Sequence, residues 1–127
     1  MKIVIVGDGK VGSALAVQLS KEGHDIVIID SDKLALQESE QSLDVNVVQG
    51  NGATLKAQKQ ANVDSCDLLI AATSADEINL LCCILARKLG CTHTIARVRN
   101  PEYFAQLHLL KDEIGLSMAI NPERATA

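Results

Sequence analysis

Aromatic side chains are almost missing from this chain, whose 127 residues include one Tyr, one Phe and no Trp. A core built from this sequence must therefore be aliphatic. Proteins that bind single-stranded nucleic acid stack bases on aromatic side chains, and proteins that bind the phosphate backbone carry a basic patch. Because the chain lacks aromatics and has a formal net charge of −4, we expect no nucleic-acid partner.

Long apolar runs and paired cysteines are also missing. No run approaches the ~20 residues of a membrane helix. The first residues lead into glycines without the apolar region and cleavage site of a signal peptide, so we expect a cytoplasmic protein. Cys66, Cys82, Cys83 and Cys91 form no C-x-x-C motif. We expect four reduced structural thiols, with Cys82 and Cys83 on different faces of a helix.

Short apolar runs rich in β-branched residues alternate with longer segments of helical period, which is the pattern of a parallel α/β sheet. The length fits one domain. We predict an α/β fold, a Rossmann-like doubly wound parallel sheet of about six strands with helices on both faces. The predicted strands are Lys2–Val6, Ile26–Ile29, Val45–Val48, Leu68–Ala71, Thr94–Val98 and Leu116–Ile120.

Caps and stop signals predict the first three helices. The first carries Val11, Leu15 and Leu19 on one side and ends at Gly23. For the second, through about Ser42, we expect Ser31 as the N-cap and Asp32 as a carboxylate in the first turn. A shorter helix covers roughly Thr54–Gln60.

The later helices have stronger start signals. Ser74 and Glu77 form an S-x-x-E capping box, and Gly90 ends the helix that follows, whose apolar side carries Ile78, Leu81, Leu85 and Leu89. Asn100-Pro101 opens another helix. Asn121-Pro122-Glu123 is a further helix start close to Ala127, so we expect a fragment of something longer. Met1 directly before the first strand favours a stand-alone subunit.

The stretch "IVGDGKVG" places Gly7, Gly9 and Gly12 in the spacing G-x-G-x-x-G between a predicted strand and a predicted helix. In this context Gly7 permits a tight turn, Gly9 lets a pyrophosphate approach the backbone, and Gly12 lets the helix pack closely on the strand. The helix N-terminus then offers N–H groups to phosphates. Lys10 either pairs with a phosphate or points to solvent, and Asp8 is expected to face outward.

Asp30 follows the second predicted strand, 18 residues after Gly12. A carboxylate at this position accepts the hydroxyls of an adenosine ribose and repels a 2′-phosphate, which disfavours NADP. This ribose is common to NAD, NADH, ATP, ADP and AMP, so Asp30 does not distinguish between them.

The other strand ends complete the predicted crevice, which opens between the first and fourth strands. The Gly50–Ala53 turn is expected near the adenine, and Thr73 and Ser74 are expected beside the phosphates or the distal half of a dinucleotide. Arg97 reaches a terminal phosphate or forms a surface salt bridge, and Arg99 favours the salt bridge. The candidate nucleotide-binding residues are Gly7, Asp8, Gly9, Lys10, Val11, Gly12, Asp30, Ser31, Asn51, Gly52, Ala53, Ala72, Thr73, Ser74 and Arg97.

No catalytic group accompanies these residues. His24, His93 and His108 are expected to be surface or structural histidines, and the Ser and Cys residues have no base at a recognisable spacing. We therefore expect a binding protein and not an enzyme, with no metal site. The alternative is the cofactor-binding half of an NAD-dependent oxidoreductase.

Three further segments, "VVQGNGA", "AATSADEINLLC" and "ARVRNPEY", occur in this order after the glycine loop. Together they make the chain resemble the N-terminal nucleotide-binding lobe of TrkA-type proteins, also called the RCK or KTN domain. Asn51 stands where a common family variant has Asp. The resemblance covers residues 1–124, and we expect the whole chain, 1–127, to be this lobe without the C-terminal RCK lobe.

The resemblance implies a cytoplasmic regulatory domain of a Trk/Ktr-type potassium uptake system, peripheral to the inner face of the cell membrane. Such lobes bind NAD(H), ATP or ADP, form homodimers that assemble into a ring, and act on a membrane potassium transporter. By matching motifs, the resemblance assigns a ligand-binding role to five features of this sequence. They are the phosphate loop (Gly7, Gly9, Gly12), the ribose-binding acid Asp30, the base-side turn (Asn51, Gly52, Ala53), the edge of the fourth strand (Thr73, Ser74) and Arg97 near the phosphates.

Overall fold

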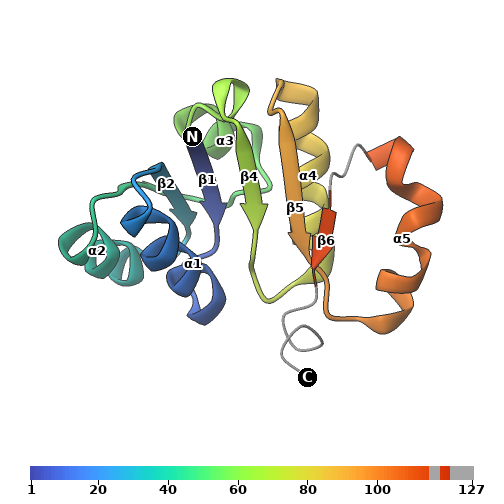
Figure 1. The fold of residues 1–127 in the computed structure, drawn as a ribbon, viewed down its shortest axis with the longest axis horizontal. Helices are drawn as coiled ribbons and strands as arrows, with labels where there is room; N and C mark the ends of the chain where they lie inside the picture. The colour runs from blue at the N-terminus through green and yellow to red at the C-terminus, as the bar shows by residue number, and fades with distance from the viewer. Residues whose placement is uncertain (115–117, 121–127) are drawn as a thin grey trace.

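Six parallel strands form one sheet in the order β3-β2-β1-β4-β5-β6 (Figure 1). The computed structural model describes residues 1–114 and 118–120. The strands are β1 (Lys2–Val6), β2 (Asp25–Asp30), β3 (Asn46–Gln49), β4 (Leu68–Ala71), β5 (His93–Arg97) and β6 (Met118–Ile120). The predicted doubly wound Rossmann-like sheet is therefore confirmed. The predicted start of the last strand at Leu116 lies outside the described residues.

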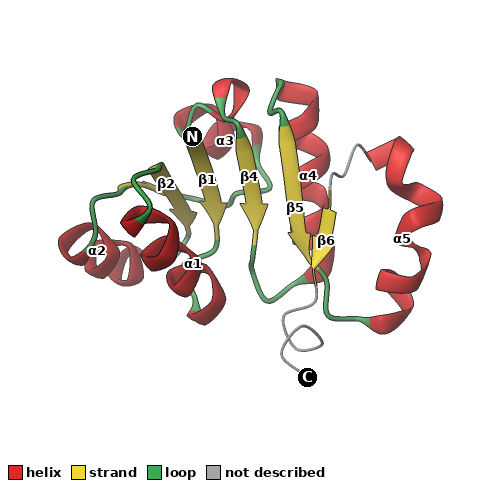
Figure 2. Cartoon of the chain, viewed as in Figure 1, coloured by secondary structure: helices red, strands yellow, loops and turns green. Residues whose placement is uncertain are grey.

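Within the described residues, five α-helices and one short 3₁₀ helix connect the strands (Figure 2). They are α1 (Lys10–Lys21), α2 (Lys33–Ser42), α3 (Leu55–Gln60), η1 (Val63–Ser65), α4 (Asp76–Leu89) and α5 (Pro101–Ile114). Among these helices none combines the length and apolarity of a membrane span. The helix start predicted at Asn121–Glu123 lies outside the described residues.

The helices cover both faces of the sheet because alternate residues of each central strand point to opposite sides. Ile3 and Ile5 pack with residues of α1 and α2, whereas Val4 and Val6 pack with residues of α3, α4 and α5. Burial of β1 on both faces explains why its sequence is continuously apolar. Every strand pair is parallel, so all the carboxyl ends meet at one edge.

The buried side of α4 differs from the prediction. Leu81 is 48% exposed, and the buried residues of the helix are Asp76, Asn79, Cys82, Cys83 and Ala86. Both Cys82 and Cys83 are buried because α4 is covered on more than one side. Gln58 of α3 donates to the Cys82 carbonyl at 3.0 Å, and α4 also contacts β5 and α5. All four cysteines are buried, and none of them forms a disulfide.

Candidate nucleotide-binding site

A cavity of about 650 Å³ opens at the carboxyl edge of the sheet, where the strand order reverses between β1 and β4. Ligands of open α/β sheets bind at this position, and the volume is typical of small-molecule sites. Twelve of the fifteen candidate residues line the cavity: Gly7, Gly9, Lys10, Val11, Asp30, Ser31, Asn51, Gly52, Ala72, Thr73, Ser74 and Arg97. Asp8, Gly12 and Ala53 do not.

The glycine loop fixes how closely α1 approaches β1. Gly7 has φ +105°, a conformation that favours glycine, and a side chain there would also crowd the Ala72 carbonyl. A Cβ on Gly12 would collide with the carbonyl oxygen of Gly7. Gly12 is therefore required for helix packing and contributes to the site without lining it.

Gly9 has the opposite surroundings, because a Cβ added there meets no atom within 4 Å. It is also the N-cap of α1, and no side chain caps this helix. Lys10 and Val11 follow it in the cavity wall. The site thus combines open space with the positive end of a 12-residue helix, which is an arrangement suited to phosphate.

The Asp30 carboxylate is held in place by two backbone donors. The Asp8 N–H donates to Oδ2 over 2.6 Å, and the Asp32 N–H donates to Oδ1 over 2.7 Å. Each carboxylate oxygen has more than one acceptor direction, so the fixed group can still accept hydroxyl donors from the cavity.

Asp8 does not face outward, contrary to the prediction. It is 6% exposed, and its carboxylate accepts hydrogen bonds from the hydroxyls of Ser13, at 2.9 Å, and Ser39, at 2.7 Å. These contacts tie the glycine loop to α1 and α2. A buried carboxylate needs such partners, and the serines that supply them lie up to 31 residues away along the chain.

The N-cap of α2 is Asp32 and not Ser31. The Asp32 Oδ1 accepts from the N–H groups of Leu34 and Ala35, at 3.0 and 3.3 Å. Ser31 is exposed and lines the cavity. Because adjacent residues both had capping side chains, the sequence pattern did not distinguish between them.

The turn after β3 closes one end of the cavity. A Cβ on Gly52 would collide with Val6, so only glycine lets the turn lie against β1. Asn51 Oδ1 accepts from the Ala53 N–H at 2.9 Å. Gln58, which is fully buried and was missed by the sequence prediction, donates to the Gly52 carbonyl at 2.9 Å. The turn is therefore fixed from both sides.

The predicted capping box at Ser74 does not form. Ala75 is the N-cap of α4, with no side-chain hydrogen bond, and Ser74 is exposed in the cavity wall. Glu77 instead accepts a hydrogen bond from the Tyr103 hydroxyl at 3.0 Å. Asp76 accepts from the N–H groups of Arg99 and Asn100, at 2.9 and 2.7 Å, which fastens the loop after β5 to α4.

Asn79 is the main feature that the sequence prediction missed. Its fully buried side chain makes three hydrogen bonds to Thr73 and one to the Arg97 carbonyl. It thereby joins the carboxyl ends of β4 and β5. The sequence signal was a single polar residue within the otherwise apolar run 78–86 of α4.

Arg97 lies in the cavity wall and forms no ion pair among the described residues. Its Nη1 donates to the Thr73 carbonyl at 3.2 Å, while its Nε is buried and has no partner in the part of the chain that the structure describes. An arginine with an unused buried donor is suited to an anionic ligand. Arg99 also lines the cavity.

The three histidines lie away from the cavity. His93 and His108 are exposed and His24, which lies 3.5 Å from Glu22, is half-buried. Residues 1–114 and 118–120 bring together no group of His, Cys, Asp or Glu suited to a metal ion. The side chains that line the cavity offer binding groups, with no histidine among them.

Two curated relatives are similar to the chain along its whole length. It is 38% identical over 127 residues to a Trk system potassium uptake protein TrkA homolog of Methanothermobacter thermautotrophicus, covering 57% of that protein. It is 39% identical over 126 residues to Trk system potassium uptake protein TrkA of Halomonas elongata, covering 28% of it. The chain thus spans between about a quarter and somewhat over half the length of these relatives.

Solved structures share the fold. The TrkA-N domain of the inner membrane protein ybaL from Escherichia coli superposes with a TM-score of 0.86 at 23% identity, covering 98% of this chain and 90% of that one. The GsuK channel bound to NAD superposes with a TM-score of 0.77 at 23% identity, covering 94% of this chain and 21% of that one. GsuK bound to ADP superposes with a TM-score of 0.75 at 25% identity, covering 94% of this chain and 31% of that one.

The family model described as the TrkA-N domain matches residues 3–122, nearly the whole chain. The match spans the glycine loop, the fixed Asp30 carboxylate and the cavity at the β1/β4 boundary. This chain belongs to the TrkA-N domain family.

Proposed function

We propose that the chain is a cytoplasmic regulatory nucleotide-binding domain of a Trk/Ktr-type potassium uptake system. It binds NAD(H) or an adenine nucleotide in the cavity, and its occupancy alters potassium flux through a membrane transporter. The observation that carries this proposal is the combination in one cavity of the uncapped α1 N-terminus, open space at Gly9 and the carboxylate of Asp30. Relatives named as Trk potassium uptake proteins support the potassium system.

In this proposal the phosphates lie at Gly9 and the start of α1, and the ribose hydroxyls donate to Asp30. The base lies against the Asn51–Gly52 turn. Arg97 contributes its unpartnered Nε to the phosphates or to the distal half of a dinucleotide. GsuK structures that hold NAD and ADP support both ligand classes.

Regulation requires that the nucleotide bind two arrangements of the assembly with different affinity. A hundredfold difference corresponds to about 2.7 kcal/mol, within the usual range of allosteric coupling. We further propose that residues 1–127 form the N-terminal lobe of an RCK protein, that the lobe dimerises, and that dimers assemble into a ring beneath the transporter.

The test is calorimetric titration of the chain with NAD, NADH, ATP, ADP and AMP in one buffer. Different affinities for NADH and NAD indicate a redox sensor, and different affinities for ATP and ADP indicate an energy sensor. Comparison of ATP, ADP and AMP also measures what the terminal phosphates add. Binding of none of the five contradicts the proposal.

The matched variants are Asp30→Ala and Asp25→Ala, which remove carboxylates from opposite ends of β2. We expect Asp30→Ala to weaken binding by about tenfold or more and Asp25→Ala, at an exposed position, to leave it unchanged. Asp30→Asn keeps one acceptor for the Asp8 and Asp32 N–H groups and separates lost binding from lost folding. Unchanged affinity in folded Asp30→Ala overturns the ribose assignment. Turnover of NADH with a carbonyl substrate by the full-length protein would instead support an oxidoreductase.

A further inference from the structure

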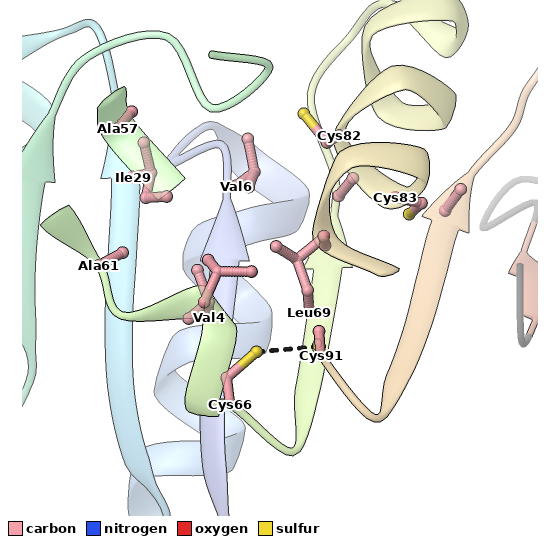
Figure 3. Close-up of a cluster of buried hydrophobic side chains, with 14 of the residues drawn as sticks. Val4, Val6, Ile29, Ala57, Ala61, Cys66, Leu69, Cys82, Cys83 and Cys91 are labelled. Carbon is pink, nitrogen blue, oxygen red and sulfur yellow. Dashed lines mark hydrogen bonds between the residues drawn. The ribbon is translucent and has the colours of Figure 1, made fainter. Parts of the chain in front are cut away.

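Two buried cysteines meet at the edge of the sheet opposite the cavity. Cys66 follows η1 and Cys91 follows the Gly90 cap of α4, and their sulfur atoms lie 2.9 Å apart (Figure 3). Both are 2% exposed. The nucleotide site makes no use of this pair.

The backbone brings these two residues together independently of the side chains. Leu68 pairs with His93 in the β4/β5 register, and the Thr92 N–H donates to the Cys66 carbonyl at 3.3 Å. The same register continued by two residues sets Cys66 beside Cys91. Neighbouring strands lie about 4.7–4.9 Å apart, within the Cα separation of about 4.4–6.8 Å that a disulfide requires. The sulfurs need to move by only about 1 Å to reach bonding distance.

The two thiols differ chemically. The hydrogen bond from Cys66 lowers the pKa of Cys91, and Arg87 lowers it further. The same contact and burial raise the pKa of Cys66. A pair of this kind offers one sulfur as the nucleophile and the other as the resolving thiol.

Neither Cys82 nor Cys83 takes part in the Cys66–Cys91 contact, and neither has a lowered pKa. Burial raises the pKa of Cys82 to about 12 and also raises that of Cys83. Their side chains lie on α4, away from the Cys66–Cys91 contact (Figure 3). By contrast, Ser65, Asp67 and Thr92, which flank the pair in the chain, are exposed, so the pair lies close to the protein surface.

We propose that Cys66 and Cys91 form a thiol-oxidation site at which hydrogen peroxide converts them into an intramolecular disulfide. The Cys91 sulfur attacks one peroxide oxygen, the O–O bond breaks, and a sulfenic acid forms as the other oxygen leaves and takes the Cys91 proton as water. The Cys66 sulfur then attacks the sulfenic sulfur, the S–S bond forms, and the S–O bond breaks. The oxygen of the sulfenic acid leaves as water with the Cys66 proton. The two thiols thus supply the two electrons that reduce the peroxide.

The disulfide closes a loop that contains β4 and α4. It joins residues that lie two positions before the neighbouring strands β4 and β5. Because it constrains the unfolded chain, the oxidised protein melts at a higher temperature. Because the bond forms at the edge opposite the cavity, we expect nucleotide affinity to change by less than about twofold.

The experiment treats the folded chain with hydrogen peroxide, removes the peroxide with catalase, and alkylates the remaining thiols in denaturant. Digestion with trypsin and a glutamate-specific protease cleaves the chain after residues that include Lys59, Glu77, Arg87, Lys88 and Arg97. Cys66, the adjacent Cys82 and Cys83, and Cys91 therefore fall on three separate peptides. We expect a cross-linked pair of peptides, residues 60–77 with 89–97, and its loss on reduction. Two of the four thiols remain alkylatable.

The variants are Cys91→Ala, which should give no cross-link, and Cys83→Ala as the matched control, which should keep it. Met1, which is 63% exposed, reports by its own oxidation that the peroxide has acted. If Met1 is oxidised while Cys66 and Cys91 of the wild-type chain remain alkylatable, the proposal is overturned. A cross-link through Cys82 or Cys83 overturns it equally. Neither result depends on nucleotide binding, and the wild-type map needs no variant to fold.

Discussion

Asn79 holds Thr73 by three hydrogen bonds: its Oδ1 accepts from the Thr73 N–H and hydroxyl, at 2.9 and 2.6 Å, and its Nδ2 donates to the Thr73 carbonyl at 3.0 Å. The same Nδ2 donates to the Arg97 carbonyl at 2.8 Å. One side chain thus satisfies backbone groups at the ends of two strands. It also sets the separation of two cavity-lining residues.

We expect Asn79→Ala to lower the free energy of unfolding by about 2–4 kcal/mol, because buried polar groups lose their partners. The matched control is Asn46→Ala, at an exposed position on β3, which should change it by less than about 0.5 kcal/mol. Denaturant titration measures both. Equal stability of the two variants would show that the Thr73 groups find other partners.

Alanine substitutions of the two loop glycines, Gly12 and Gly9, should affect the stability of the fold and the binding of nucleotide differently. In Gly12→Ala the added methyl collides with the Gly7 carbonyl, and we expect a loss of about 1–3 kcal/mol in unfolding free energy, as overpacking typically causes. In Gly9→Ala the methyl enters open space, and the loss should stay below about 1 kcal/mol.

Nucleotide affinity should respond to Gly9→Ala, because the methyl occupies space assigned to the phosphates. We expect a decrease of about tenfold or more by calorimetry, with the melting temperature nearly unchanged. If folded Gly9→Ala binds as tightly as the wild type, the phosphates do not lie at this position.

The Tyr103–Glu77 contact predicts an abnormal tyrosine titration. The hydrogen bond to Glu77, together with the negative charges of Glu77, Asp76 and Glu102, raises the pKa of Tyr103 above its ordinary value of 10.0. The folded pKa exceeds the unfolded pKa, so this contribution to stability is complete below the unfolded value and is lost as the pH rises through the folded one.

Tyr103 is the only tyrosine and the chain has no tryptophan, so ultraviolet absorbance reports its ionisation directly. We expect the native midpoint to exceed the midpoint in denaturant and Glu77→Gln to remove most of the difference. Glu102→Gln, which removes a carboxylate that makes no hydrogen bond to the phenol, should keep most of it. Equal midpoints in native and denatured protein would rule out the contact in solution.

The strand positions, the helix stop at Gly90 and the N-cap at Asn100 could be predicted because each depends on local signals: apolar runs of strand length, a left-handed glycine and a capping side chain. The glycine loop was recognisable for the same reason, since its three glycines and Asp30 have fixed spacings. These signals located most of the cavity wall.

The residues that hold the wall in place could not be predicted in this way. Asn79, Asp76 and Gln58 act through backbone groups that lie up to 24 residues away in sequence, and only the folded chain brings these groups near. Local patterns also gave wrong predictions at the N-termini of two helices. Asp32 is the N-cap of α2 in place of Ser31, and Glu77 accepts a hydrogen bond from Tyr103 instead of forming a capping box with Ser74.

The strand order has a consequence for a bound ligand. Residues 2–49 contain β1, β2 and β3, residues 68–120 contain β4, β5 and β6, and the two groups of strands meet at the β1/β4 pair. The cavity lies across this boundary and is lined by Asp30 of the first group of strands and Arg97 of the second. A ligand that fills the cavity therefore contacts both groups of strands, and its contacts add to the β1/β4 pairing and the shared core clusters that already join them.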